Sequence, residues 1–228
     1  MPFKPFNPNE KVQRHRGNLP HWQQQGTTYF VTSRLADSLP ADVLDHWRRL
    51  QKAWFDAHGI SSVLRLDHLT EEQRHEYHRE FTARFHELLD AGHGACPLAD
   101  PACADVLIRK LVEGHGNAYH LDAWGIMPNH FHAIVEPAEG RELGDIMQRW
   151  KGGSAREINL ARRTSGKLWH REAFDHIVRS EAQLNHFRRY MSMNPAKASL
   201  RGGYVLGVSA ESGLSAGDVL ERFGLQPK

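Results

Sequence analysis

Two pairs of residues could carry out chemistry in this sequence, and the first is His130 and His132 on either side of Phe131. The surrounding residues are typical of a β-strand, where side chains alternate between two faces. Both imidazoles then point to one face and can reach a single metal ion, while Phe131 points to the core. Because the chain has 16 histidines in 228 residues, about one His-x-His pair is expected by chance. The pair by itself therefore also fits two ordinary histidines.

The second pair is Tyr190 and Asn194, which are four residues apart in a predicted helix and so share one face. They lie at the edge of an apolar stripe, so the tyrosine hydroxyl could point into a site. The carboxamide oxygen of Asn194 is a hard ligand that suits a divalent cation. Helical pattern alone favours a simpler interpretation, a packing tyrosine followed by an Asn-Pro pair that ends the helix.

The elements that must position these pairs follow from hydrophobic periodicity and capping signals. Strands are predicted at 27–33, 119–126, 130–136 and 174–179, and residues 127–129 form the corner of a β-hairpin. Capping boxes at 70–73 and 180–183 each begin a helix. The predicted helices cover residues 40–59, 70–89, 102–112, 143–163 and 180–194.

This order predicts an α+β fold, an antiparallel or mixed sheet with helices packed on it. We expect an extended N-terminal arm at 1–26, a catalytic domain at 27–200 and a Gly- and Ser-rich C-terminal tail at 201–228. Residues 41–116 form a helical insertion between the first two strands. The tail is expected to carry a short helix at 216–223.

Composition limits the class of protein. A chain of 228 residues with 40% hydrophobic residues can bury one core. It has no apolar run long enough for a membrane span and no signal-peptide pattern, and its two cysteines favour the cytoplasm. Cys96 and Cys103 with His93 are poorly spaced for a zinc site. Net charge is only +2, so a basic surface must be local.

Three blocks of the sequence resemble, in order, those of single-tyrosine transposases of the HUH (His-hydrophobic-His) class. The first is Trp-Gly-Ile-Met-Pro-Asn-His-Phe-His-Ala-Ile-Val at 124–135. The others are Trp-His-Arg-Glu-Ala-Phe-Asp-His-Ile-Val-Arg at 169–179 and Tyr-Met-Ser-Met-Asn-Pro-Ala-Lys-Ala at 190–198. The chain is most similar to REP-associated tyrosine transposases, relatives of small insertion-sequence transposases, and the resemblance covers about residues 27–200.

The resemblance implies cleavage and rejoining of single-stranded DNA near hairpins such as REP-like palindromes. It assigns His130 and His132 to a divalent cation, Mg²⁺ or Mn²⁺, with Asn194 completing the metal site. It makes Tyr190 the nucleophile that forms a 5′-phosphotyrosine intermediate. The implied fold is a ferredoxin-like sheet with helices.

A DNA partner requires basic side chains along the path of the strand. Residues 149–171 are rich in Arg and Lys with few opposing acids, and more cations lie near Tyr190. The arm adds basic residues and Trp22, which could stack on a base or pack in the protein. The predicted DNA-binding residues are Arg149, Lys151, Arg156, Arg162, Arg163, Lys167, Arg171, Arg188, Arg189 and Lys197.

Three alternatives stay open from the sequence. The chain could be a replication initiator or relaxase that uses the same motif, or a domesticated binder of palindromic DNA that does not cleave. A hydrolytic metalloenzyme with a small substrate is a third, for which no further acid/base pair is evident. Both a monomer and a homodimer with a shared active site fit the resemblance.

Overall fold

The computed structural model describes residues 3–7, 9–10, 13–16, 20–60, 69–200 and 202–208. Within these ranges, side chains are described except at 13–16, 20–22, 74, 75 and 78. The helix predicted at 216–223 lies outside the described residues, as do the side chains of Trp22 and of most basic residues in the arm.

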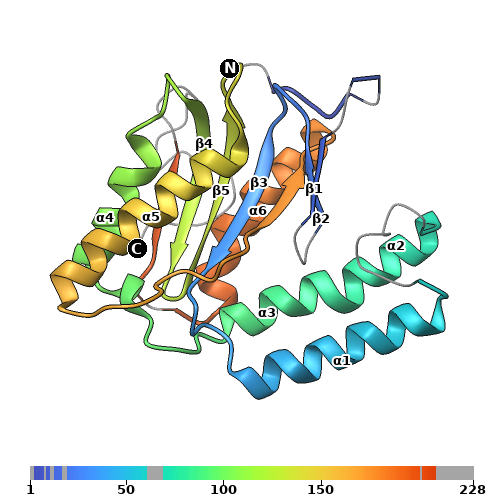
Figure 1. Cartoon of the computed structure of the whole chain (residues 1–228), viewed down its shortest axis with the longest axis horizontal. Coiled ribbons are helices and arrows are strands. Elements are labelled where there is room, and N and C mark those ends of the chain that lie inside the picture. The colour runs from blue at the N-terminus through green and yellow to red at the C-terminus, as the bar shows by residue number, and fades with distance from the viewer. Residues whose placement is uncertain are drawn as a thin grey trace.

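The centre of the fold is a five-stranded antiparallel sheet (Figure 1). Its strands are β3 (Tyr29–Arg34), β4 (Tyr119–Met127), β5 (His130–Pro137), β6 (Phe174–Ile177) and β7 (Val205–Val208). They lie side by side in the order β6-β3-β5-β4-β7. Without the edge strand β7, the spatial order is fourth, first, third, second, with helical connections after the first and third strands, which is the ferredoxin-like arrangement. The predicted fold class is confirmed, and every pairing in this sheet is antiparallel.

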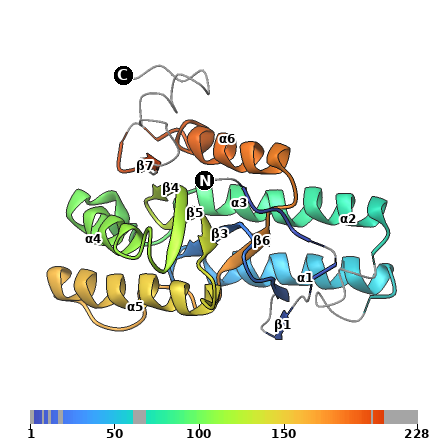
Figure 2. The ribbon, with the colours of Figure 1, turned by 90° about the horizontal axis from the view of Figure 1, so that it is seen from above.

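Helices cover the two faces of this sheet in separate layers (Figure 2). One face carries α4 (Pro101–Val112) and α5 (Leu143–Arg162), and the other carries α6 (Glu181–Lys197). The larger core lies under α4 and α5, where Val31, Phe131 and Trp150 pack together. A smaller cluster that includes Phe30, Ile134 and Met191 lies under α6.

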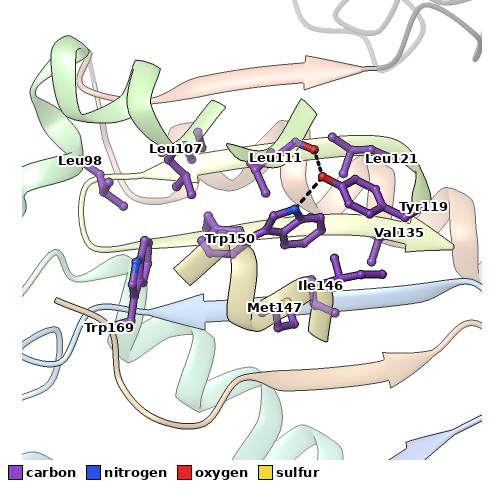
Figure 3. Close-up of a cluster of buried hydrophobic side chains, with 14 of the residues drawn as sticks. Leu98, Leu107, Leu111, Tyr119, Leu121, Val135, Ile146, Met147, Trp150 and Trp169 are labelled. Carbon is purple, nitrogen blue, oxygen red and sulfur yellow. Dashed lines mark hydrogen bonds between the residues drawn. The ribbon is translucent and has the colours of Figure 1, made fainter. Parts of the chain in front are cut away.

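Hydrogen bonds of the larger core converge on the buried hydroxyl of Tyr119 (Figure 3). It accepts from the indole N–H of Trp150 at 2.8 Å and donates to the carbonyl oxygen of Leu111 at 2.9 Å. The N–H of Gly114 also points to it, at 3.2 Å. The hydroxyl thus satisfies buried donors from two helical segments and ties them to β4.

The helical insertion adds a separate layer next to the sheet (Figure 2). It begins with α1 (Ala41–Ala57), continues with α2 (Glu71–Tyr77), a π-helical segment (His78–Ala83) and α3 (Arg84–Asp90), and then has a 3₁₀ turn (Pro97–Ala99) before α4. Phe55, Tyr77 and Phe81 pack in its own apolar cluster. In α1, Leu50 is 43% exposed, whereas Phe55 is buried.

Several helices begin where the capping signals predict. Thr70 and Gln73 exchange two hydrogen bonds of 3.0 and 3.2 Å before α2. At α6, Ser180 accepts from the backbone N–H of Gln183 at 3.2 Å. Asp100 accepts from the N–H of Ala102 at 3.0 Å and caps α4. Each bond satisfies a backbone donor that the first turn leaves free.

The structure corrects three predictions about the ends of the chain and of α6. Part of the arm forms paired strands, β1 (Gln13–Arg16) and β2 (Pro20–Gln23), instead of a single extended segment. The tail contributes β7, which was not predicted because four residues give little periodicity. The helix α6 runs past Pro195 to Lys197. Pro195 removes one backbone hydrogen bond and its ring crowds the carbonyl of Met191, but it lies in the last turn, so this cost is confined to the end of the helix.

Among the residues that the structure describes, no helix has both the length and the hydrophobicity required to cross a bilayer.

We predict that Tyr119→Phe lowers the free energy of unfolding by about 1–3 kcal/mol, because it leaves buried N–H donors unpaired at nearly constant volume. Urea denaturation followed by circular dichroism measures this change. Tyr204→Phe is the matched control, since Tyr204 is 38% exposed and should change stability by less than about 0.5 kcal/mol. Equal stability of the two variants would contradict the role of the Tyr119 hydroxyl.

Candidate active site

The two histidines of the HUH block meet on the α6 face of the sheet. They are residues 130 and 132 of β5, and each is 1% exposed. Their Nε2 atoms lie 3.1 Å apart. Phe131, between them, is in the larger core on the opposite face. The alternation predicted from the sequence therefore occurs, and both imidazoles converge on one point.

Each imidazole is oriented by a hydrogen bond at its Nδ1 atom. His130 Nδ1 lies 2.7 Å from Asn129 Oδ1, and His132 Nδ1 lies 2.7 Å from Thr32 Oγ1. The orientation of the Asn129 amide is fixed because its Nδ2 donates to the carbonyl oxygens of Leu89 and His93, each at 3.1 Å. Asn129 must therefore accept from His130, which places the proton on Nδ1 and the lone pair on Nε2.

Burial keeps both rings neutral. Burial, with a smaller contribution from nearby His86, lowers the pKa of His130 to about 3. Burial, then His130 and His86, lower the pKa of His132 well below its usual value. A neutral imidazole is the form that binds a metal ion. At neutral pH His130 thus presents an Nε2 lone pair, and His132 does so when its proton is on Nδ1 and donated to Thr32 Oγ1.

Tyr190 and Asn194 reach the same point from α6. Asn194 is fully buried, and its amide nitrogen lies 3.2 Å from His132 Nε2. The Tyr190 ring lies edge-on to His132, with ring centroids 5.2 Å apart. Gly125 is paired with His132 across the β4–β5 ladder. A Cβ at Gly125 would lie 3.3 Å from the Leu206 side chain of β7 and in ordinary contact, at 3.7 Å, with Met191 of α6.

The hydroxyl of Tyr190 is enclosed. Its oxygen has no exposed surface and no hydrogen-bond partner of good geometry among the described residues. Burial raises the pKa of Tyr190 above its usual value, and the nearby Asp90 carboxylate raises it further, while the Asn194 amide lowers it. The phenol therefore stays protonated at neutral pH in this arrangement.

Sequence reasoning missed two site residues, His86 and Asp90, both on α3. The His86 ring lies 5.4 Å from that of Tyr190 and 5.7 Å from that of His132. Asp90 Oδ1 lies 3.6 Å from His130 Nε2. Their four-residue spacing was the only available signal, and it is common in a charged helix. Nothing in the local pattern indicates that the insertion packs against the HUH histidines.

The donor set fits a divalent cation. Two ligands about 2.1 Å from an octahedral ion are about 3.0 Å apart, close to the separation of the two Nε2 atoms. Asn194 Oδ1 is buried without a partner among the described residues. The oxygen and nitrogen of a side-chain amide are assigned from their hydrogen bonds. Turning the Asn194 amide by 180° would bring its oxygen towards His132. No three His, Cys, Asp or Glu side chains of the described residues already surround one point, so a third ligand requires the Asn194 amide or a carboxylate that shifts towards the histidines.

The predicted DNA-binding residues divide into separate groups. Arg188 is half-buried and forms a two-pronged ion pair with Asp122 of β4, so a phosphate would have to compete with this carboxylate, and its role in DNA binding stays a prediction. The Lys151 ammonium donates to the carbonyl oxygen of Arg171 at 2.8 Å. Arg189 and Lys197 are exposed on α6. The others lie on α5, across the sheet from the histidines, or in the loop after it: Arg149, Arg156, Arg162, Arg163, Lys167 and Arg171.

Residues 107–194 match the family model described as "Transposase IS200 like". This segment is similar to IS200-like transposases. The match contains both HUH histidines, Tyr190 and Asn194, so the resemblance seen in the three blocks is confirmed. The matched segment begins inside α4, and His86 and Asp90 lie before it.

Two solved structures are similar to this chain. One is a REP-associated tyrosine transposase bound to a REP hairpin, with 16% identity and a TM-score of 0.41, covering 78% of this chain and 71% of that chain. The other is a candidate transposase from Deinococcus radiodurans R1, with 14% identity and a TM-score of 0.31, covering 80% of this chain and 97% of that chain. No curated protein sequence matches the chain.

We predict that the ion-free protein loses stability as pH falls from about 6.5 towards 4. Burial lowers the pKa of His86 to about 4, so the unfolded state binds more protons than the folded state in this window. The stability that a neutral buried histidine contributes above pH 6.5 is then lost on acidification, by on the order of 2 kcal/mol at pH 5. Burial raises the pKa of Asp90 to about 6, so Asp90 offsets part of this loss.

The measurement is urea unfolding in a chelator at pH 7.5 and pH 5. His86→Phe should reduce the difference between the two pH values by about 2 kcal/mol. His186→Phe is the control, because His186 is exposed on α6, and it should keep the full difference. If the His86→Phe variant kept the full pH dependence, His86 would bind a proton as readily in the folded state as in the unfolded state, which would contradict the prediction.

Proposed function

We propose that this chain is a metal-dependent transposase that cleaves and rejoins single-stranded DNA near hairpins through a 5′-phosphotyrosine on Tyr190. One observation carries the proposal. The phenol of Tyr190 and the amide of Asn194 come from adjacent turns of α6, and both lie against His132. A nucleophile, two imidazoles and an amide oxygen are thus gathered in one buried place. The family match supports this reading over a small-molecule hydrolase.

His130, His132 and Asn194 are the residues that would hold the ion. When bound, a divalent cation neutralises phosphate charge and polarises the phosphorus for attack. Hydrogen bonds to Asn129 and Thr32 keep the two imidazoles turned towards the ion site. Two nitrogens and one amide oxygen form an incomplete shell, which leaves room for substrate oxygens and suits a catalytic rather than a structural site.

In the proposed cleavage step, Tyr190 Oη forms a bond to phosphorus as the bond from phosphorus to the 3′ oxygen breaks. The phenol loses its proton and the leaving 3′ oxygen gains one, so the step needs no net proton. The number of phosphoester bonds is unchanged, and a second 3′-hydroxyl can therefore reverse the reaction without ATP. Rejoining to a different 3′ end completes strand transfer.

Phosphate would approach Tyr190 from the side of Lys197. The Lys197 ammonium lies 5.6 Å from the centroid of the Tyr190 ring and is exposed. A cation there favours both a phosphate and a developing phenolate. Arg189 extends this basic surface along α6. The exposed residues of α5 and its following loop are proposed to contact parts of the DNA farther from the cut.

A second candidate, a binder of palindromic DNA that does not cleave, is favoured by one specific observation. The Tyr190 oxygen has no exposed surface, so cleavage requires a neighbouring side chain to move. A protein that only binds DNA would need no such movement. It would also need neither His132 nor Tyr190.

Incubation of the protein with Mn²⁺ and a hairpin-bearing single strand should give a covalent adduct on a denaturing gel. Tyr190→Phe should reduce the adduct to background, because it removes the attacking oxygen. His132→Ala should reduce its rate of formation about a hundredfold or more. Both variants should still bind the hairpin in a gel-shift assay.

Tyr204→Phe is the control for loss of a phenol elsewhere, since Tyr204 is exposed near β7. An adduct that persists in Tyr190→Phe would remove Tyr190 from its role. Hairpin binding by the wild type with no adduct under any metal condition would favour the non-cleaving binder.

A further inference from the structure

We propose that the Asp90 carboxylate is a further ligand of the divalent cation, so that the helical insertion is part of the active site. This inference rests on the proposed function, because it concerns the ion held by His130, His132 and Asn194. It adds a residue from outside the matched segment 107–194. It also assigns the helical insertion a role in metal binding.

The position of the carboxylate is the first argument. Asp90 is the last residue of α3, and its Oδ1 lies 3.6 Å from His130 Nε2. This atom has no exposed surface and no hydrogen-bond partner among the described residues. Adjacent ligands of one ion lie about 3.0–3.4 Å apart, so a shift of a few tenths of an ångström brings the oxygen into place.

Electrostatics is the second argument. A buried carboxylate is costly unless a cation or hydrogen-bond donors compensate it. Among the described residues, the only ion pair of Asp90 within 4 Å is with His130, whose ring is neutral. The Asn194 amide donates to the carboxylate, and Lys197 acts on it only at longer range, so neither supplies a cation in contact with Oδ1. A divalent cation between Asp90 and the imidazoles would supply the missing positive charge.

The third argument is that Asp90 is held firmly beside the metal site. Asn129 Nδ2 donates to the carbonyl oxygens of Leu89 and His93, which lie on either side of Asp90 in the chain. The same amide accepts from His130 through Oδ1. One side chain therefore fixes both a metal-binding imidazole and the end of α3. These hydrogen bonds fix the position of Asp90 relative to His130.

Mn²⁺ binding without DNA tests the proposal independently of catalysis. Affinity can be measured by electron paramagnetic resonance of free Mn²⁺ and by the rise in melting temperature on adding Mn²⁺. Asp90→Asn keeps the shape and removes the charge, and it should weaken Mn²⁺ binding about tenfold or more. Glu87→Gln makes the same charge change at an exposed position of α3, and it should change affinity by less than about twofold.

The metal-free melting temperature controls for folding. Because the carboxylate is largely desolvated and has no charged cation in contact, Asp90→Asn should not lower it. Asp90→Ala provides a second variant with the same expected loss of Mn²⁺ affinity. Wild-type affinity in both Asp90 variants, with binding abolished in His132→Ala, would overturn the role of Asp90 and leave the histidine site intact. Absence of Mn²⁺ binding by the wild type would overturn the metal site of the proposed function as well.

Discussion

The structure depends on two neutral imidazole nitrogens that face each other at 3.1 Å in a buried place. His130 donates its Nδ1–H to Asn129, so its Nε2 presents a lone pair to His132. A neutral His132 with its proton on Nε2 donates to this lone pair, whereas a neutral His132 with its proton on Nδ1 donates to Thr32 and presents a second lone pair. Two lone pairs at this distance repel unless a cation lies between them, so the second form is the one that suits a metal ion.

The fold supplies this arrangement from four separate segments. Strand β3 brings Thr32 opposite His132, and the hairpin corner brings Asn129 beside His130. Helix α6 adds Asn194 and the tyrosine over the small residue Gly125, and α3 adds a carboxylate from the insertion. Each segment is fixed by the core or by hydrogen bonds, which is the preorganisation that a catalytic site requires.

Local signals in the sequence predicted much of the candidate site. The remaining contacts could not be predicted, because they depend on tertiary packing. Strand alternation predicted that His130 and His132 share a face, and the capping box at Ser180 placed Tyr190 and Asn194 on one helix. Asp90 could not be predicted, because its contact with His130 spans forty residues and depends on how the insertion docks. The same limit applies to Arg188, whose pairing with Asp122 follows from the packing of α6 on β4.

The most direct measurement is the anomalous diffraction of a crystal grown with Mn²⁺. The account predicts a manganese peak within bonding distance of the Nε2 atoms of both His130 and His132, next to Asn194 and facing the Tyr190 hydroxyl. A peak elsewhere on the molecule, or none at saturating Mn²⁺ with the two imidazoles hydrogen-bonded to each other, would contradict it.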